Sequence, residues 1–159
     1  MLKFTNPATL SKPFSRYTHV VTAPEGCRWV HISGQVGATV EGTVPEGFEA
    51  QARQTWANVL AAVRAGGMDI KDIVKANLFL TRREDIPSSR SIRDEMLQGH
   101  APASTMLLVS GLALPSLLLE IEVVAARPIA AKGQTGAKRP KPARKPKRKA
   151  KARAKSRRR

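Results

Sequence analysis

The chain has 159 residues, of which 28 are lysine or arginine and 12 are acidic, and its single cysteine excludes an internal disulfide. Residues 132–159 hold 15 of the basic residues and no acidic one, which leaves 13 basic against 12 acidic residues in a nearly neutral stretch, 1–131. No apolar run approaches the ~20 residues that span a membrane, and the first residues lack the apolar core of a signal peptide. We therefore expect a cytoplasmic protein with one domain over residues 1–130 and a separate basic segment over residues 131–159.

The N-terminal part of the chain predicts an irregular lead-in followed by a β-hairpin. Residues 1–16 hold two prolines among mostly polar side chains. Two short β-rich runs follow, at residues 17–23 and 28–33, and the Pro-Glu-Gly sequence between them is typical of a turn. The second run leads into Ser-Gly-Gln-Val-Gly, residues 33–37, where glycine permits close approach of another chain segment or a ligand.

A helix and a strand are predicted next. Thr43 and Glu46 have the spacing of a capping box, which places the start of the helix just after Thr43. Apolar residues then recur with a helical period as far as Val63, and the glycine pair 66–67 supplies a C-terminal stop. Residues 72–81 follow as a strand with one apolar face for this helix and one mixed face.

Residues 87–97 predict a second helix, and residues 101–128 predict two strands joined by a short loop. In the last strand apolar side chains alternate from Leu117 to Ala125, while the opposite face carries Glu120 and Glu122. Two carboxylates on a partly apolar face indicate a covered site or a subunit contact. The order of elements predicts an α+β fold with both helices on one face of the sheet. Because the other face stays uncovered, we expect self-association.

Several separated segments resemble the RidA/YjgF family of reactive intermediate deaminases. These segments are PFS at 13–15, ISGQVG at 32–37, residues 50–81, and residues 102–125, and together the resemblance covers residues 6–128. It implies a chorismate-mutase-like fold assembled as a homotrimer with three clefts between subunits. It also implies that a small 2-imino or 2-enamino acid is hydrolysed there to a 2-keto acid and ammonia, without a cofactor or a metal.

The family's site residues carry over to this sequence one position at a time. The glutamate that positions or activates water corresponds to Glu120, for which a structural acceptor at a subunit contact is the alternative. The serine and glycine of the SGQ segment correspond to Ser33 and Gly34, and the aromatic wall of the cleft corresponds to Phe14. We predict Glu120 as the catalytic residue and a ligand-binding set made of Phe14, Ser33, Gly34, Arg90, Ser104 and Thr105.

One family residue is missing, because Ser104 stands where the Pro-Ala-Arg motif has the arginine that grips the substrate carboxylate. A guanidinium binds a carboxylate through a bidentate, charge-assisted pair, whereas a hydroxyl makes one neutral bond. The exchange costs about 2–4 kcal/mol of anchoring if the carboxylate is desolvated. Arg16 and Arg90 are candidates to replace the lost cation, and a solvated surface charge is the alternative for both. The two functional hypotheses are a hydrolase with an altered substrate and a non-catalytic module that binds a small metabolite.

The remaining candidates are a metal site, a reactive thiol and the basic segment. His19, His31 and His100 lack metal-ligand spacing, so we predict no metal, and Cys27 reads as a loop or strand thiol rather than a nucleophile. The basic segment predicts a disordered arm that contacts DNA or RNA, and three arms on a trimer would act together at the nucleoid. A solubilising tail or a localisation signal is the alternative. The predicted nucleic-acid-binding residues are Lys138, Arg139, Lys141, Arg144, Lys145, Lys147, Arg148 and Lys149.

Overall fold

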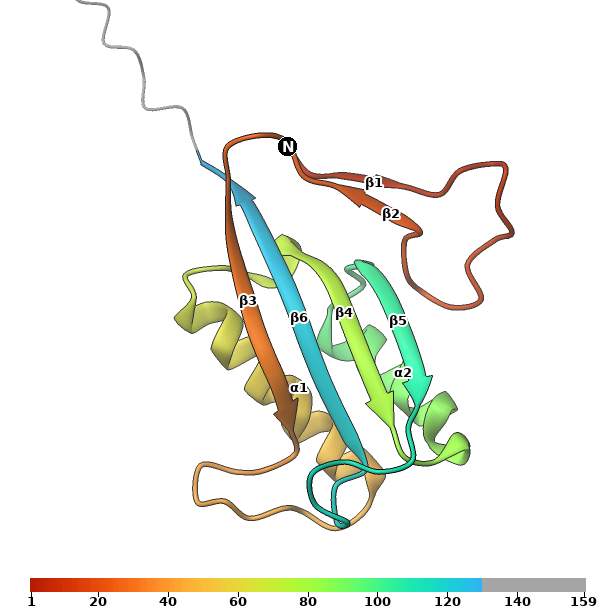
Figure 1. Ribbon diagram of the computed structural model, residues 1–159, viewed down its shortest axis with the longest axis vertical. Helices are drawn as coiled ribbons and strands as arrows, with labels where there is room; N and C mark the ends of the chain where they lie inside the picture. Colours follow the sequence, from red (N-terminus) through yellow and green to blue (C-terminus); the bar gives the residue numbers. More distant parts are fainter. Residues whose placement is uncertain (130–159) are drawn as a thin grey trace, which may run out of the picture.

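The computed structural model describes residues 1–129, which form a four-stranded mixed sheet with two helices on one face and a small separate sheet (Figure 1). The basic segment and its predicted contact residues lie outside the described residues. None of the helices within residues 1–129 is long and apolar enough to cross a membrane. The elements are β1 (Lys3–Thr5), β2 (Val20–Thr22), β3 (Cys27–Val36), α1 (Phe48–Ala65), η1 (Ile70–Asp72), β4 (Ile73–Leu80), η2 (Arg83–Asp85), α2 (Ile86–Met96), β5 (Ala103–Leu108) and β6 (Leu119–Pro128).

The main sheet has the strand order β3-β6-β4-β5, so the last strand of the chain lies at its centre. β6 pairs antiparallel with both β3 and β4, and β5 runs parallel to β4 along the outer edge. The predicted alternation in β6 is confirmed, because Leu119, Ile121 and Val123 are buried while Glu120 is half-buried and Glu122 is exposed. Both helices lie on the face that carries the buried residues, as expected (Figure 1).

Helix α1 buries the predicted stripe against β3 and β6. Ala52, Trp56 and Val59 are fully buried, and each large apolar side chain removed from water contributes about 1.5–3 kcal/mol. The predicted capping box is wrong, because the helix begins at Phe48. Residues 39–43 instead form a turn of their own, in which the Thr39 N–H donates to the carbonyl oxygen of Thr43 at 2.9 Å.

The predicted hairpin between residues 17–23 and 28–33 is also wrong. β2 pairs with β1 inside the segment expected to be irregular, and the two form the small sheet beyond one end of the main sheet (Figure 1). β3 pairs with β6 over its whole length, which separates it from β2. The turn signal at Pro-Glu-Gly is real, with Gly26 at φ 70°, but it changes the direction of the chain without pairing its two strands.

An ion pair ties the C-terminal end of β6 to the short helix η1. The Arg127 guanidinium donates to the Asp72 carboxylate, and its Nη1 donates to the Gly67 carbonyl oxygen at 3.0 Å. Burial alone would raise the pKa of Asp72, but hydrogen bonds from Arg127 and from the Asp69 N–H outweigh it and hold this pKa below its usual value. The tie fixes the end of β6, the strand that carries Glu120 and Glu122.

Candidate functional site

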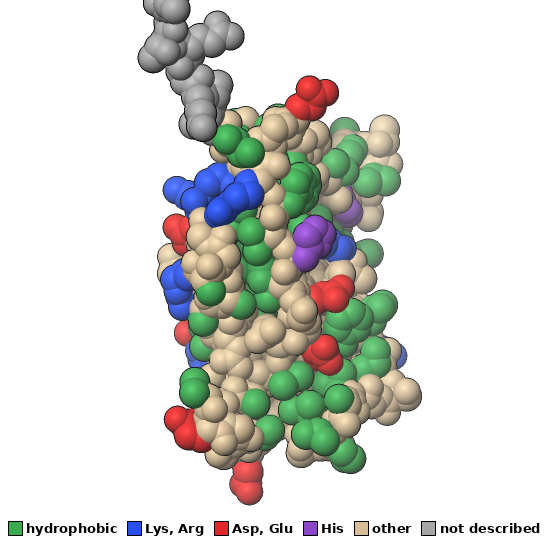
Figure 2. Space-filling view, turned by 60° about the vertical axis from the view of Figure 1, so that its left-hand side comes forward, with side chains coloured by type: hydrophobic (Ala, Val, Ile, Leu, Met, Phe, Trp, Pro, Cys, Tyr) green, Lys and Arg blue, Asp and Glu red, His purple; other side chains and the backbone are tan. Residues whose placement is uncertain are grey.

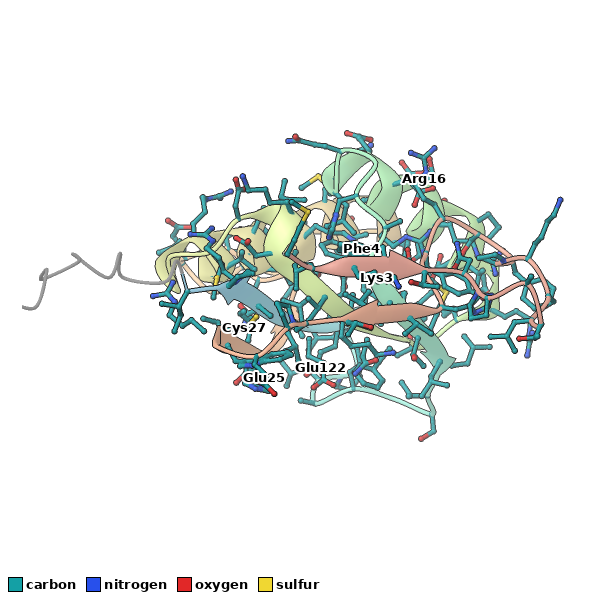
Figure 3. All side chains as sticks on the ribbon, turned by 90° about the horizontal axis from the view of Figure 1, so that it is seen from above. Lys3, Phe4, Arg16, Glu25, Cys27 and Glu122 are labelled. Carbon is teal, nitrogen blue, oxygen red and sulfur yellow. The ribbon has the colours of Figure 1, made fainter. Side chains whose placement is uncertain are left out.

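The face of the sheet opposite the helices carries a row of polar side chains from its two central strands. In the register of β4 and β6, Asn77 lies opposite Glu122 and Phe79 lies opposite Glu120. Viewed along the sheet, Glu122 points away from the helices, whereas Arg16 lies beside α2 (Figure 3). Acidic, histidine and hydrophobic side chains lie next to one another on this side of the molecule (Figure 2). The open face therefore has the mixed polar and apolar character that the sequence predicts.

A β-bulge brings Gly34 against Glu120. Between Ile32 and Gln35, β3 holds Ser33 and Gly34, while the matching stretch of β6 holds only Glu122, so two residues oppose one. The Glu120 side chain lies over this bulge, and a Cβ on Gly34 would overlap its Oε1 atom. A glycine at this point gives the carboxyl group the space it occupies, because any other residue would displace it.

A cavity of about 230 Å³ opens on the same face, beside the bulge. At its edge the Asn77 amide donates to Glu122 Oε1 at 2.8 Å, and Lys75 Nζ donates to Thr105 Oγ1 at 2.5 Å. Burial lowers the pKa of Lys75, because a partly desolvated site disfavours the charged ammonium. The residues lining this cavity are His31, Ile32, Ser33, Lys75, Asn77, Glu122, Val123 and Val124.

A second cavity, of about 190 Å³, lies at the β5 edge between α2 and the segment of residues 14–17. Ser104 pairs with Ala76 in the β4–β5 register, which puts it on the helix side of the sheet. Its hydroxyl is buried and makes no hydrogen bond to any other described residue. The lining residues are Phe14, Ser15, Tyr17, Arg90, Arg93, Ser104 and Met106.

The structure thus sorts the predicted site residues into two groups on opposite faces of the sheet. Ser33, Gly34, Thr105 and Glu120 belong to the open face. Phe14, Arg90 and Ser104 meet in the second cavity. One chain does not bring Glu120 and Ser104 together, because their side chains lie on opposite faces of the sheet and β4 lies between their strands.

Two arginines lie differently from the sequence-based expectation. Arg16 does not line the second cavity and instead lies 3.7 Å from Asp94, with more than half of its side chain exposed. Arg93, which is not among the predicted ligand-binding residues, does line the cavity. Its spacing of three residues from Arg90, which puts both on one side of a helix, is the sequence signal that could have found it.

No three histidine, cysteine, aspartate or glutamate side chains gather into a metal-binding group anywhere in residues 1–129. Of the three histidines, His31 lines the open-face cavity, His19 bonds through Nε2 to the Ser11 carbonyl oxygen at 2.9 Å, and His100 bonds to the Ile73 carbonyl oxygen at 2.8 Å.

Comparison with known proteins gives one consistent family. The model of the family described as Endoribonuclease L-PSP matches residues 8–127. The 2-iminobutanoate/2-iminopropanoate deaminase of Dermatophagoides farinae is 32% identical over 85 residues, which are 52% of this chain and 66% of that protein. The protein of the same name in Mus musculus is 32% identical over 100 residues, 62% of this chain and 73% of that protein. The crystal structure of YyfB from Yersinia pestis, a protein of unknown function of the conserved Rid family, has a TM-score of 0.72 and 29% identity and covers 79% of this chain and 98% of its own.

Proposed function

Because this chain belongs to the Endoribonuclease L-PSP family, the RidA/YjgF family that its motifs resemble, we propose that it hydrolyses a small imine or enamine to a carbonyl compound and ammonia. The observation that carries the proposal is the position of Glu120, whose half-buried carboxyl group lies over the Gly34 bulge. Water adds to the C=N carbon, and the nitrogen must gain protons before it leaves as ammonia. A carboxylate next to the C=N carbon can accept a proton from that water and return it to the nitrogen.

The complete cleft forms between two subunits of a homotrimer in this proposal. Its support is the separation of the two residue groups, because a ligand that touches both Glu120 and Ser104 needs the open face of one chain and the β5 edge of another. The open face also leaves Trp29 and Leu107 each 50% exposed, and contact with a second copy would bury them. We expect three equivalent clefts, each with the Glu120 group from one subunit and the Ser104 group from the next.

The test of this function is ammonia release from freshly generated 2-iminopropanoate and 2-iminobutanoate, compared between the wild-type protein and Ser104→Arg. We expect the wild type to accelerate release over uncatalysed hydrolysis, and Ser104→Arg, which restores the family's cation, serves as the positive control. Activity in Ser104→Arg alone would assign the cleft to an imine of different chemistry. If neither protein accelerates ammonia release, the hydrolase proposal is contradicted and a module that only binds a metabolite is favoured.

A second function, contact with nucleic acid, is favoured by the 15 basic residues and no acidic residue in residues 132–159. We expect the full chain to bind duplex DNA with an affinity that falls steeply with salt, by a log–log slope of about −0.9 for each phosphate engaged. A chain ending at residue 131 should lose this binding, because the remaining residues carry a net charge of only +1. Fluorescence anisotropy of labelled duplex DNA at several salt concentrations measures the affinity of each chain and its dependence on salt. Equal binding by the two chains would place the contact elsewhere.

A further inference from the structure

The cavity at the β5 edge is lined by two cations and no acidic residue. Arg90 and Arg93 contribute the positive charges, and Ser15, Tyr17 and Ser104 contribute hydroxyl groups. The two arginines differ in their surroundings, because Arg90 is exposed whereas only 3% of the Arg93 side chain is accessible. A buried guanidinium is costly unless its charge is compensated, so its partners decide what the cavity can bind.

Arg93 is only partly compensated by the protein. Its Nε and Nη2 atoms donate to the same oxygen of Asp94, Oδ1, at 3.0 and 2.8 Å. A guanidinium has five N–H donors in a planar fork, and within residues 1–129 no other acceptor is hydrogen-bonded to this one. The second Asp94 oxygen lies 3.7 Å from Arg16 Nε, so one carboxylate serves two cations.

Ser104, which forms part of the cavity wall, also lacks a hydrogen-bond partner among the described residues. Its buried hydroxyl makes no hydrogen bond in the described part of the chain, and a buried polar group without a partner is unfavourable. Because Arg93 and Ser104 both line this cavity, a small anion bound in it can accept hydrogen bonds from both. One ligand group would therefore satisfy both residues, which lie on different elements.

We infer that Arg93 replaces the family arginine as the cation that binds the ligand's carboxylate, so that the anchor comes from helix α2 instead of strand β5. Arg93 rather than Arg90 has this role, because a buried charge acts through a lower dielectric and is less screened than an exposed one. Ser104 supports the role, since its small side chain leaves the space that an arginine on β5 would fill. The carboxylate as ligand rests on the proposed function, but the subsite does not require that hydrolysis takes place.

The experiment is isothermal titration of the full chain with sodium 2-oxobutanoate, with the uncharged methyl ester as the matched ligand. Arg93→Gln should bind the acid about 10- to 100-fold more weakly than the wild type, the range for loss of a charge-assisted pair. Arg93→Lys keeps the positive charge but not the planar set of N–H donors, so its loss of affinity for the acid should be smaller. Arg16→Gln is the control, because Arg16 contacts the same Asp94 from outside the cavity. The affinity of Arg16→Gln for 2-oxobutanoate should stay within about twofold of wild type.

Three results would overturn the inference: equal binding by wild type and Arg93→Gln, an equal loss in Arg16→Gln, or no preference of the wild type for the acid over the ester. If Arg93→Gln does not fold, Arg93→Lys carries the test, and equal binding of the acid by wild type and Arg93→Lys would then contradict the inference. If Arg93→Gln does fold, the swapped variant Ser104→Arg/Arg93→Gln is added. The swapped variant should regain carboxylate binding, and failure to regain it in a folded protein contradicts the subsite. If the protein binds the acid through Arg93 but releases no ammonia from imines, the proposed hydrolase activity is wrong and the carboxylate subsite still holds.

Discussion

Glu120→Gln is expected to reduce ammonia release from 2-iminobutanoate by about 10²- to 10⁴-fold, the contribution of a positioned acid–base group. The amide has almost the same shape as the carboxyl group, so it can occupy the same place over Gly34. It cannot accept a proton from water and return it to the leaving nitrogen. The measurement is the initial rate of ammonia release, taken together with the circular dichroism and the oligomeric state of the variant.

Glu122→Gln is the matched control, because Glu122 lies two residues further along the same face of β6 and its carboxylate accepts a hydrogen bond from Asn77 at 2.8 Å. An amide oxygen can still accept that bond, so we expect its rate to stay within about threefold of wild type. Equal losses in the two variants would show a general charge effect. Dissociation of the proposed trimer in Glu120→Gln would assign Glu120 to subunit contact instead of catalysis.

Gly34→Ala is expected to reduce the rate by about 10²-fold, because the added methyl group would occupy the position of Glu120 Oε1 and displace the Glu120 carboxyl group. The cost in stability should be small, since the atoms that must move are the end of a flexible side chain. Thermal unfolding should therefore change little. Gly111→Ala is the control, because a Cβ at Gly111 meets no atom within 4 Å.

The double variant separates an effect through Glu120 from one through the cleft as a whole. If Gly34 acts by leaving room for Glu120, then Gly34→Ala should cost almost nothing further in a Glu120→Gln background. Independent losses that multiply would contradict this coupling and show that Gly34 contacts the ligand directly.

The parts of the fold that follow from local pattern could be predicted from the sequence. The helical stripe of α1 around Trp56 and the alternation of β6 around Ile121 both reflect burial on one face, which leaves a periodic trace. No periodic pattern shows which strand pairs with β2. Whether β2 pairs with β1 or with β3 depends on β6, which pairs with β3 along its length. The spacing of Thr43 and Glu46 misplaces the start of α1, because Thr43 hydrogen-bonds to Thr39 in a separate turn and the helix begins only at Phe48.

The candidate site was predictable in its members but not in its arrangement. The sequence identifies Ser104 as the departure from the family motif, but it does not indicate which cation lies in the same cavity. Arg16 is close to Phe14 in the chain but points to Asp94 at the surface, and Arg93 reaches the cavity from the buried side of α2. The face on which a residue lies follows from strand register, and register is set by long-range pairing that a single sequence does not display.

The central place of β6 has a consequence for how the chain folds. Strands β3 and β4 each pair with a segment, residues 119–128, that follows them by dozens of residues, so neither can complete its hydrogen bonds while that segment is absent. During synthesis the apolar face of α1 therefore has no finished sheet to pack on until β6 has emerged. Folding that depends on contacts between residues far apart in the sequence is slow. Until β6 pairs with them, the unpaired edges of β3 and β4 are open to association with other chains.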